Sequence, residues 1–180
     1  MGSGKSTIGR DLARRLGLEF IDIDHMIESS ENLTVKELFA QKGEPYFRRI
    51  ETGQIRRALD SKKRSVISLG GGALMQLRNR DLVRKQALLI YIYSRPEEIY
   101  KRIKHSTKRP LFSAGDETPD PDQAMKRIMN LMEEREEGYN GADIRFDRDN
   151  MDAADAAGRI AELVHERYPW IEADQNPRDL

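Results

Sequence analysis

Residues 2–7 read Gly-Ser-Gly-Lys-Ser-Thr and lie directly before a stretch with helical periodicity. Within 6–16, Ile8, Leu12 and Leu16 recur at a spacing of four, which predicts an amphipathic helix. Glycines let backbone N–H groups turn inward around phosphate oxygens, and a helix N-terminus adds partial positive charge. The segment matches the end of the phosphate-loop pattern, in which four residues separate a first glycine from Gly-Lys-Ser/Thr. The alternative is a flexible, glycine-rich start of the chain.

The chemistry of a phosphate loop assigns roles to two of these side chains. Lys5 reaches the β- and γ-phosphates of a nucleoside triphosphate, and the Ser6 hydroxyl ligates Mg²⁺. We therefore predict an ATP site formed by Gly2, Ser3, Gly4, Lys5, Ser6 and Thr7.

The pattern is incomplete at its start. Its first glycine, and the strand that precedes a phosphate loop, have no counterpart before Gly2. Such a strand lies inside the sheet, so without it the neighbouring strands would lose ladder partners in a buried region. We therefore expect the natural sequence to begin about ten residues earlier, the length of a loop start plus a typical strand.

The composition limits the class of protein. The 180 residues include 31 Lys plus Arg, 31 Asp plus Glu and no cysteine, for a net charge of zero. A neutral chain has no global positive field that attracts nucleic acid or anionic lipid, and a chain without cysteine has neither disulfides nor thiolate metal sites. The longest apolar run, at 87–93, is far shorter than the ~20 residues that span a bilayer. We expect a soluble, cytoplasmic monomer that binds neither nucleic acid nor membranes.

Short β-rich runs alternate with amphipathic stretches along the chain, which is typical of an α/β protein with a parallel sheet. Strands are expected at 18–23, 65–69, 87–93 and 142–147, and helices at 34–42, 44–59, 77–86, 96–104, 123–139 and 151–168. The proline-rich segment 105–122 is predicted to be a long, mobile lid. We predict one domain over 1–168 and a disordered tail over 169–180.

Two carboxylates stand at the predicted end of the strand 18–23. Asp22 and Asp24 are two residues apart, so in a strand their side chains share a face. Parallel strands present ligand-binding groups at their C-terminal ends, where carboxylates suit Mg²⁺ and a substrate hydroxyl. The alternative is that Asp24 caps the next turn or helix.

Two arginines fall on apolar helix faces. At ~100° per residue, Arg48 lies among Phe47, Ile55 and Leu59, and a guanidinium there needs an anionic partner. Glu44 and Glu51 are within helical reach of Arg48, so an internal ion pair is an equal alternative to a ligand.

Arg135 falls inside the apolar stripe of the helix 123–139. Two arginines on two inward faces indicate a bidentate clamp on a carboxylate.

A glycine triplet, Gly70-Gly71-Gly72, follows the strand 65–69. It leaves room for a ligand against the main chain, or it is a plain tight turn. Arg109 precedes Pro110 in the predicted lid, where an arginine can close over a transferring phosphate or remain a solvated surface group.

Together these features resemble the shikimate kinase family, from Met1 to about Asp147. The resemblance is carried by Gly-Ser-Gly-Lys-Ser-Thr at 2–7, Asp22-Ile23-Asp24, Gly43-Glu44 with Phe47-Arg48-Arg49-Ile50-Glu51, Ser68-Leu69-Gly70-Gly71-Gly72-Ala73, Arg109-Pro110-Leu111, and Arg135 with Tyr139. The loop alone occurs in many kinases, but the ordered combination is specific. The resemblance implies a three-layer P-loop kinase fold, similar to that of nucleoside monophosphate kinases. It has a five-stranded parallel sheet (its first strand is missing here), a lid, and a shikimate-binding segment at about 25–52.

The resemblance also implies ATP-dependent phosphorylation of the 3-hydroxyl of shikimate with Mg²⁺, in chorismate and aromatic amino-acid biosynthesis. Shikimate would be bound by Asp24, Arg48, Gly70, Gly71, Gly72 and Arg135. Asp24 would contact the ring hydroxyls and accept the reacting proton. Lys5 and Arg109 would neutralise the transferring phosphoryl group. Arg102 would lie beside the nucleotide, and Asp22 would organise Mg²⁺ with Ser6.

Two other functions fit part of this pattern. A gluconate-type kinase of the same fold shares residues 2–7 but has no evident need for two inward arginines and a glycine triplet. A nucleotide-binding module without catalysis fits a chain that lacks the first strand.

Overall fold

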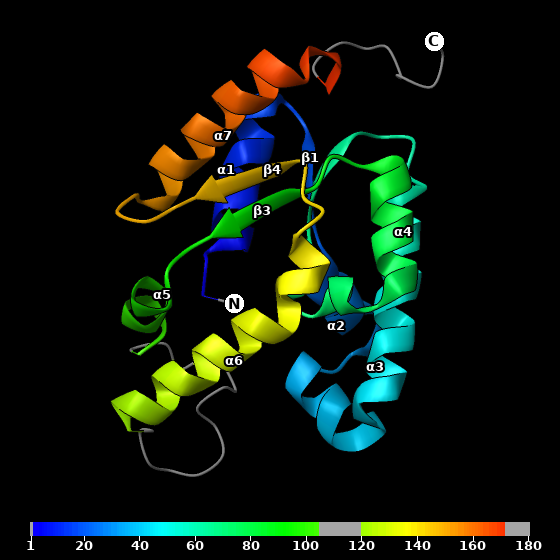
Figure 1. The fold of residues 1–180 in the computed structure, drawn as a ribbon. Helices are drawn as coiled ribbons and strands as arrows, with labels where there is room; N and C mark the ends of the chain where they lie inside the picture. The colour runs from blue at the N-terminus through cyan, green and yellow to red at the C-terminus, as the bar shows by residue number, and fades with distance from the viewer. Residues whose placement is uncertain (1, 105–119, 172–180) are drawn as a thin grey trace.

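The computed structural model describes residues 2–104 and 120–171. Helices and strands alternate along the described chain, as the sequence predicts (Figure 1). The elements are α1 (Lys5–Leu16), β1 (Glu19–Asp22), α2 (Ile23–Glu31), α3 (Val35–Leu59), β2 (Ser65–Ser68), η1 (Ala73–Met75), α4 (Leu77–Gln86), β3 (Ile90–Tyr93), α5 (Pro96–Ile103), α6 (Pro121–Tyr139), β4 (Ile144–Asp147), α7 (Ala153–Arg167) and η3 (Pro169–Ile171).

The four described strands pair in parallel as two separate sheets. β1 pairs with β2, from Glu19 opposite Ser65 to Asp22 opposite Ser68. β3 pairs with β4, from Ile90 opposite Ile144 onward. The register of the first pair places the ends of β1 and β2 side by side, and these ends carry the side chains of the candidate site.

A cavity of about 1490 Å³ is lined by residues of both β2 and β3. No strand of the described residues fills it, so the inner edges of β2 and β3 have no ladder partner there. The walls are mixed, with apolar side chains that include Ile8, Val66, Ile90, Ile92 and Ile160 beside polar and charged ones such as Lys5 and Arg135. Among the described residues, β2 and β3 therefore each have a ladder partner on one side only.

Two apolar cores fix the helices around the strands. One core joins α1, α7 and β4 and includes Ile8, Leu12, Phe146, Ala156 and Ile160. The other joins α2, α3, η1 and α4 and includes Ile27, Leu38, Phe47, Ile55 and Leu74. A third, smaller cluster of Ile99, Ile103 and Ile128 holds α5 against α6.

Helix α3 has the local signals that the sequence indicates. It begins at a capping box in which Thr34 and Glu37 bind each other's backbone N–H groups. Gly43 interrupts it with φ 77 and ψ 168, just before Pro45, which fits two consecutive helices better than one straight rod. The kink orients the second half of α3, and with it Arg48 and Glu51.

Several predicted boundaries are wrong. The strands predicted at 87–93 and 142–147 begin later, at Ile90 and Ile144. Three other differences concern the lid, the tail and the candidate site. Residues 121 and 122 belong to the first turn of α6 rather than to the lid, because Pro121 suits the start of a helix. Residues 169–171 form the 3₁₀ helix η3 rather than a disordered tail. The strand predicted at 18–23 ends at Asp22, because the Asp22 side chain caps α2. The rest of the predicted lid (105–119) and of the tail (172–180) lies outside the described residues.

Candidate functional site

The predicted phosphate loop leads directly into α1. Gly2 and Gly4 have φ of 66 and 75, conformations that glycine adopts without strain. Gly4 is the N-cap of α1, and no side chain caps the helix. The first amides of α1 are therefore not satisfied by a side chain, and they are the groups that bind phosphate oxygens in such loops.

A polar cluster joins this loop to the ends of β1 and β2. The Ser6 hydroxyl donates to Asp22 Oδ2 at 2.7 Å and lies 3.3 Å from Ser68 Oγ. Lys5 Nζ donates to Ser68 Oγ at 3.4 Å. Since Asp22 is opposite Ser68 in the β1–β2 register, the sheet itself brings the cluster together.

The same cluster meets the requirements of a Mg²⁺ site. Mg²⁺ prefers oxygen ligands and usually takes only one or two carboxylates, the rest being phosphates and water. Ser6 and Asp22 supply one hydroxyl and one carboxylate that already touch. No group of three or more His, Cys, Asp or Glu side chains among the described residues could hold a metal by itself. The donor set therefore fits a metal that is shared with a nucleotide.

The structure separates the two aspartates that the sequence places on one strand face. Asp22 is the N-cap of α2, and its Oδ1 accepts from the Asp24 backbone N–H at 3.1 Å. Asp24 lies in the first turn of α2, so the prediction of a shared strand face is wrong, and the cap is Asp22 rather than Asp24. Burial raises the pKa of the Asp24 carboxyl, although the charge of Lys5 opposes the shift. Asp24 thus lies close enough to Lys5 to feel its field.

Arg48 is paired within its own helix. Its Nη1 donates to Glu51 Oε2 at 2.8 Å, and its Nε and Nη2 donate to Glu44 Oε1 at 3.1 and 3.0 Å. The two partners differ, because Glu51 is fully buried whereas the Glu44 side chain is 60% exposed. Of the two alternatives for Arg48, the internal ion pair is therefore present.

The carboxylates of Glu51 and Asp24 both lie close to Gly70, the first glycine of the triplet. A Cβ on Gly70 would lie 2.7 Å from Glu51 Oε1 and 3.0 Å from Asp24 Oδ1. Glu51 Oε1 has no hydrogen-bond partner within residues 2–104 and 120–171. Burial raises the pKa of Glu51 despite its bond to Arg48. Only glycine at position 70 leaves room for both carboxylates.

The other two glycines of the triplet lie beside residues of the predicted carboxylate-binding site, Gly72 beside Arg48 and Gly71 beside Tyr139. A Cβ on Gly72 would lie 2.7 Å from Arg48 Nη2. The Gly71 carbonyl accepts from the Tyr139 hydroxyl at 2.6 Å. Burial raises the pKa of Tyr139, and the nearby charge of Arg135 opposes that shift.

Arg135 lines the cavity together with Gly70, Gly71 and Tyr139. It forms no ion pair with any residue in 2–104 or 120–171. Arg48 thus lies beside Gly72, and Arg135 lies near Tyr139, whose hydroxyl contacts Gly71.

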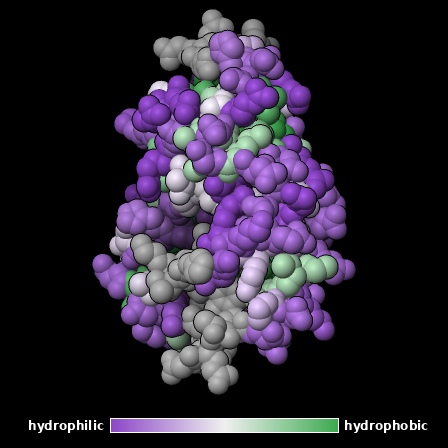
Figure 2. All heavy atoms as spheres, turned by 90° about the vertical axis from the view of Figure 1, so that its left-hand side faces the viewer, coloured by the Kyte–Doolittle hydropathy of each residue, from purple (hydrophilic) through white to green (hydrophobic). Residues whose placement is uncertain are grey.

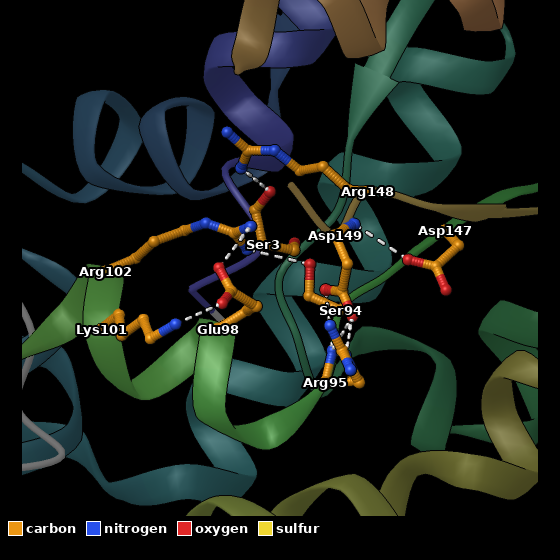
Figure 3. A network of polar contacts seen from close by, with 9 residues as sticks. All are labelled: Ser3, Ser94, Arg95, Glu98, Lys101, Arg102, Asp147, Arg148 and Asp149. Atoms are coloured by element: carbon orange, nitrogen blue, oxygen red, sulfur yellow. Dashed lines mark hydrogen bonds and ion pairs between the residues drawn. The ribbon is translucent and has the colours of Figure 1, made fainter. Parts of the chain in front are cut away.

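A third group of charges lies behind the loop (Figure 3). Arg102 Nη1 donates to Ser94 Oγ at 2.9 Å, and its Nη2 lies 3.8 Å from Glu98 Oε2. Arg148, which sequence reasoning missed, is only 7% exposed and donates to the backbone carbonyl of Ser3. Its signal in the sequence is the alternation of Ile144, Phe146 and position 148 on one face of the last strand.

For two predicted site residues, Thr7 and Arg109, the described part of the structure gives no side-chain hydrogen bond with the rest of the site. Thr7 is exposed on the first turn of α1. Arg109 lies outside the described residues, as does the lid that carries it.

One face of the molecule is strongly polar. In Figure 2, purple hydrophilic residues cover most of the face shown, and apolar residues are scattered. No helix among the described residues has the length and apolar character that crossing a membrane requires.

Taken together, the loop, the parallel strand pairs and the cluster at the strand ends define a P-loop kinase fold. The family model for shikimate kinase matches residues 1–165. The chain belongs to the shikimate kinase family, a family of ATP-dependent phosphotransferases, as its motifs predict.

Individual relatives support this assignment. The chain is 36% identical over 167 residues to a shikimate kinase of Geobacter metallireducens, covering 93% of this chain and 89% of the relative. It is 42% identical over 172 residues to a shikimate kinase of Chlorobium phaeovibrioides, covering 95% and 83%.

Solved structures agree. A shikimate kinase from Acinetobacter baumannii in complex with shikimate matches with a TM-score of 0.80 at 30% identity, covering 93% of this chain and 90% of that one. A shikimate kinase from Bacteroides thetaiotaomicron matches with a TM-score of 0.81 at 30% identity, covering 92% and 94%.

Proposed function

We propose that this chain transfers the γ-phosphoryl group of ATP to the 3-hydroxyl of shikimate. The observation that carries the proposal is the C-terminal end of β2, which joins a phosphate-binding half to an acid-binding half. Ser68, its last residue, contacts Lys5 of the phosphate loop. Gly72, four residues on, lies against the guanidinium of Arg48. The end of β2 therefore contacts Lys5, a cation suited to a triphosphate, and is followed by Gly72, which contacts Arg48, a cation suited to a carboxylate.

The nucleotide half consists of Gly2, Ser3, Gly4, Lys5, Ser6, Thr7 and Arg102. The uncapped amides of α1 and the Lys5 ammonium bind the phosphates, and Lys5 stabilises negative charge as the phosphoryl group leaves ADP. Ser6 and Asp22 would hold Mg²⁺, which when bound neutralises charge on the β- and γ-phosphate oxygens. Arg109 of the lid completes this set as a second cation on the transferring group.

The substrate half consists of Asp24, Arg48, the glycine triplet and Arg135. Arg48 is oriented by its bond to the buried Glu51, while its other edge contacts the exposed Glu44. A substrate carboxylate can replace Glu44 on that edge, because the two groups are chemically alike and Glu44 is solvated. Arg135 supplies the second cation, and the triplet gives the sugar-like ring room against the backbone.

Asp24 is the group best suited to the reacting hydroxyl. Its carboxyl lies near Lys5 on one side and near Gly70 on the other, so it stands between the two halves. Its pKa is raised by burial, which brings it closer to the range in which a carboxylate takes up a proton at neutral pH. Asp24 therefore binds the hydroxyl as a hydrogen-bond acceptor and takes the proton as the new P–O bond forms.

A coupled assay of ADP release tests the proposal. We expect ADP release when shikimate is added, and little release with gluconate or a nucleoside monophosphate. Gluconate has its carboxylate on an open chain rather than on a ring, and a nucleoside monophosphate has no carboxylate. Release with gluconate and not with shikimate would favour a gluconate-type kinase. ATP binding without any acceptor-dependent release would favour a non-catalytic nucleotide module.

The remaining expectations are also part of the proposal. We take the chain to act in the cytoplasm, as a monomer, with ATP and shikimate as its partners. Analytical ultracentrifugation of the purified protein with and without both ligands tests the oligomeric state.

A further inference from the structure

Arg148 has an unusual environment for an arginine. It follows β4 directly, and its backbone N–H donates to the Tyr93 carbonyl at 3.0 Å, which continues the β3–β4 pairing by one residue. Ile144 and Phe146, at alternate positions before it, are buried in the apolar core. Arg148 is on the same face and is 7% exposed. The strand therefore directs a full positive charge into the protein.

No carboxylate among the described residues forms an ion pair with this guanidinium. Nη1 donates to the Ser3 backbone carbonyl, and the buried Nε has no hydrogen-bond partner in the described part of the chain. Burial lowers the pKa of Arg148, the like charge of Arg102 lowers it further, and the charge of Asp152 opposes the shift. In the network of Figure 3, Arg95 is paired with Asp149 and Lys101 with Glu98, so neither of these carboxylates forms an ion pair with Arg148. A buried charge in such a setting is unfavourable for stability, so its position calls for a functional reason.

The contact with Ser3 controls the orientation of the phosphate loop. The Ser3 carbonyl and the Gly4 N–H belong to one trans peptide unit, in which the two groups point in opposite directions. Because Arg148 binds the carbonyl, the Gly4 N–H is directed away from Arg148. Gly4 has φ 75, and a Cβ there would overlap Nη1 of Arg148. Glycine at position 4 thus serves the left-handed turn and the close approach of the arginine together.

We propose that Arg148 is a positioning residue of the nucleotide site, which holds the Ser3–Gly4 peptide so that the Gly4 N–H is directed toward the phosphates of a nucleoside di- or triphosphate. The low local dielectric strengthens the charged hydrogen bond that holds this peptide. The inference rests on the proposed function only in that the loop binds a nucleotide.

Binding measurements on four proteins test the proposal, and none needs shikimate to be phosphorylated. Titration calorimetry compares adenosine, AMP, ADP and shikimate with the wild type, Arg148→Lys, Arg148→Met and Arg145→Met. Arg145 is the matched control, because it is on the opposite, exposed face of β4 and lies over the Tyr93 ring. We expect Arg148→Met to weaken ADP binding about tenfold or more, Arg148→Lys to recover part of the loss, and Arg145→Met to bind like the wild type.

Two further readouts separate positioning from a general structural role. With Arg148→Met, the loss should grow from adenosine to AMP to ADP, because the peptide that Arg148 orients binds phosphates, and the Kd of shikimate should stay within about twofold. Unchanged ADP binding, or an equal loss for adenosine, ADP and shikimate, overturns the inference. If Arg148→Met does not fold, Arg148→Lys decides, with weaker ADP and unchanged shikimate binding as the supporting result and unchanged ADP binding as the overturning one. A wild type that binds ADP but does not phosphorylate shikimate contradicts the proposed function and leaves this inference standing.

Discussion

Replacing Arg48 by methionine separates the two roles of this residue, because the structure gives it one partner inside the protein and one edge toward solvent. Arg48→Met keeps the aliphatic length and removes the charge. The buried Glu51 then loses its bond from Nη1, and its other oxygen already has no partner. The remaining neighbours of Glu51, Asp24 and Glu44, are acids whose charges raise its pKa further.

The expected destabilisation follows from this burial. Breaking a buried ion pair by removing one partner costs about 3–5 kcal/mol, because the remaining charge is uncompensated. We expect a loss of this size in the free energy of unfolding at pH 7. The raised pKa of Glu51 sets the sign of the pH dependence. A folded state that keeps a proton on Glu51 is relatively more stable at low pH, and this advantage disappears as the pH rises through the folded-state pKa. Arg48→Met should therefore approach wild-type stability as the medium is acidified from pH 7 toward pH 5.

The double variant Arg48→Met/Glu51→Gln is the decisive comparison. A neutral amide at position 51 removes the buried charge, so stability at pH 7 should return to within about 1 kcal/mol of the wild type. Shikimate binding should not return, because the cation is still missing. Charged hydrogen bonds contribute about 1.5–3 kcal/mol each, which corresponds to a roughly 10- to 150-fold weaker Kd. Urea denaturation and shikimate titration measure the two quantities. Wild-type stability of Arg48→Met at pH 7, or recovered shikimate binding in the double variant, would refute the reasoning.

Three further predictions address the other parts of the site. Lys5→Met should lower turnover about 100-fold or more, because Lys5 stabilises the charge that develops on the transferring phosphoryl group. It should change the free energy of unfolding by less than about 0.5 kcal/mol, because the Lys5 side chain donates only to the hydroxyls of Ser6 and Ser68. A large loss of stability would assign Lys5 a structural role instead. Asp24→Asn should abolish most turnover yet stabilise the protein at pH 7, because burial raises the pKa of Asp24 and penalises its charged form. The gain in stability should vanish below about pH 4, where Asp24 is protonated in both the folded and the unfolded state. Denaturation at the two pH values tests the direction of this change in stability. A segment of roughly five Val and Ile residues fused ahead of Gly2 should stabilise the chain by packing against the apolar side chains that line the cavity at β2 and β3, and a Gly/Ser segment of equal length should not; equal stabilities would argue against a strand site there.

The loop and the elements around it could be predicted because their signals are local. Glycine, lysine and serine types in a fixed order, followed by apolar residues at spacing four, are enough to specify the loop and α1. Gly43 before Pro45 likewise indicates a break within α3 at the residue where it occurs. Each of these signals depends on backbone conformation within a few residues of the chain.

The partners of charged side chains could not be predicted, because they depend on tertiary contacts. Helical geometry gave the direction of Arg48 but could not choose between an internal glutamate and a ligand, and the structure has the glutamates on the side chain's two edges. Periodicity alone assigns the apolar Ile23 to the strand, and Asp24 then shares a strand face with Asp22. The structure instead ends the strand at Asp22, because the Asp22 side chain caps α2. Arg148 is not predictable in this way because a charged residue after a short strand is usually exposed, whereas here it is buried and lies against Ser3 and Gly4, which are far from it in the sequence.

The central claim is that Arg48 and Arg135 bind the carboxylate of the acceptor. Comparing the Kd of shikimate with that of its methyl ester, in the wild type and in Arg135→Met, tests this claim most directly. We expect the wild type to prefer the acid at least tenfold and Arg135→Met to lose most of that preference, while binding of the ester changes little between the two proteins. An equal preference for the acid in both proteins would contradict the account.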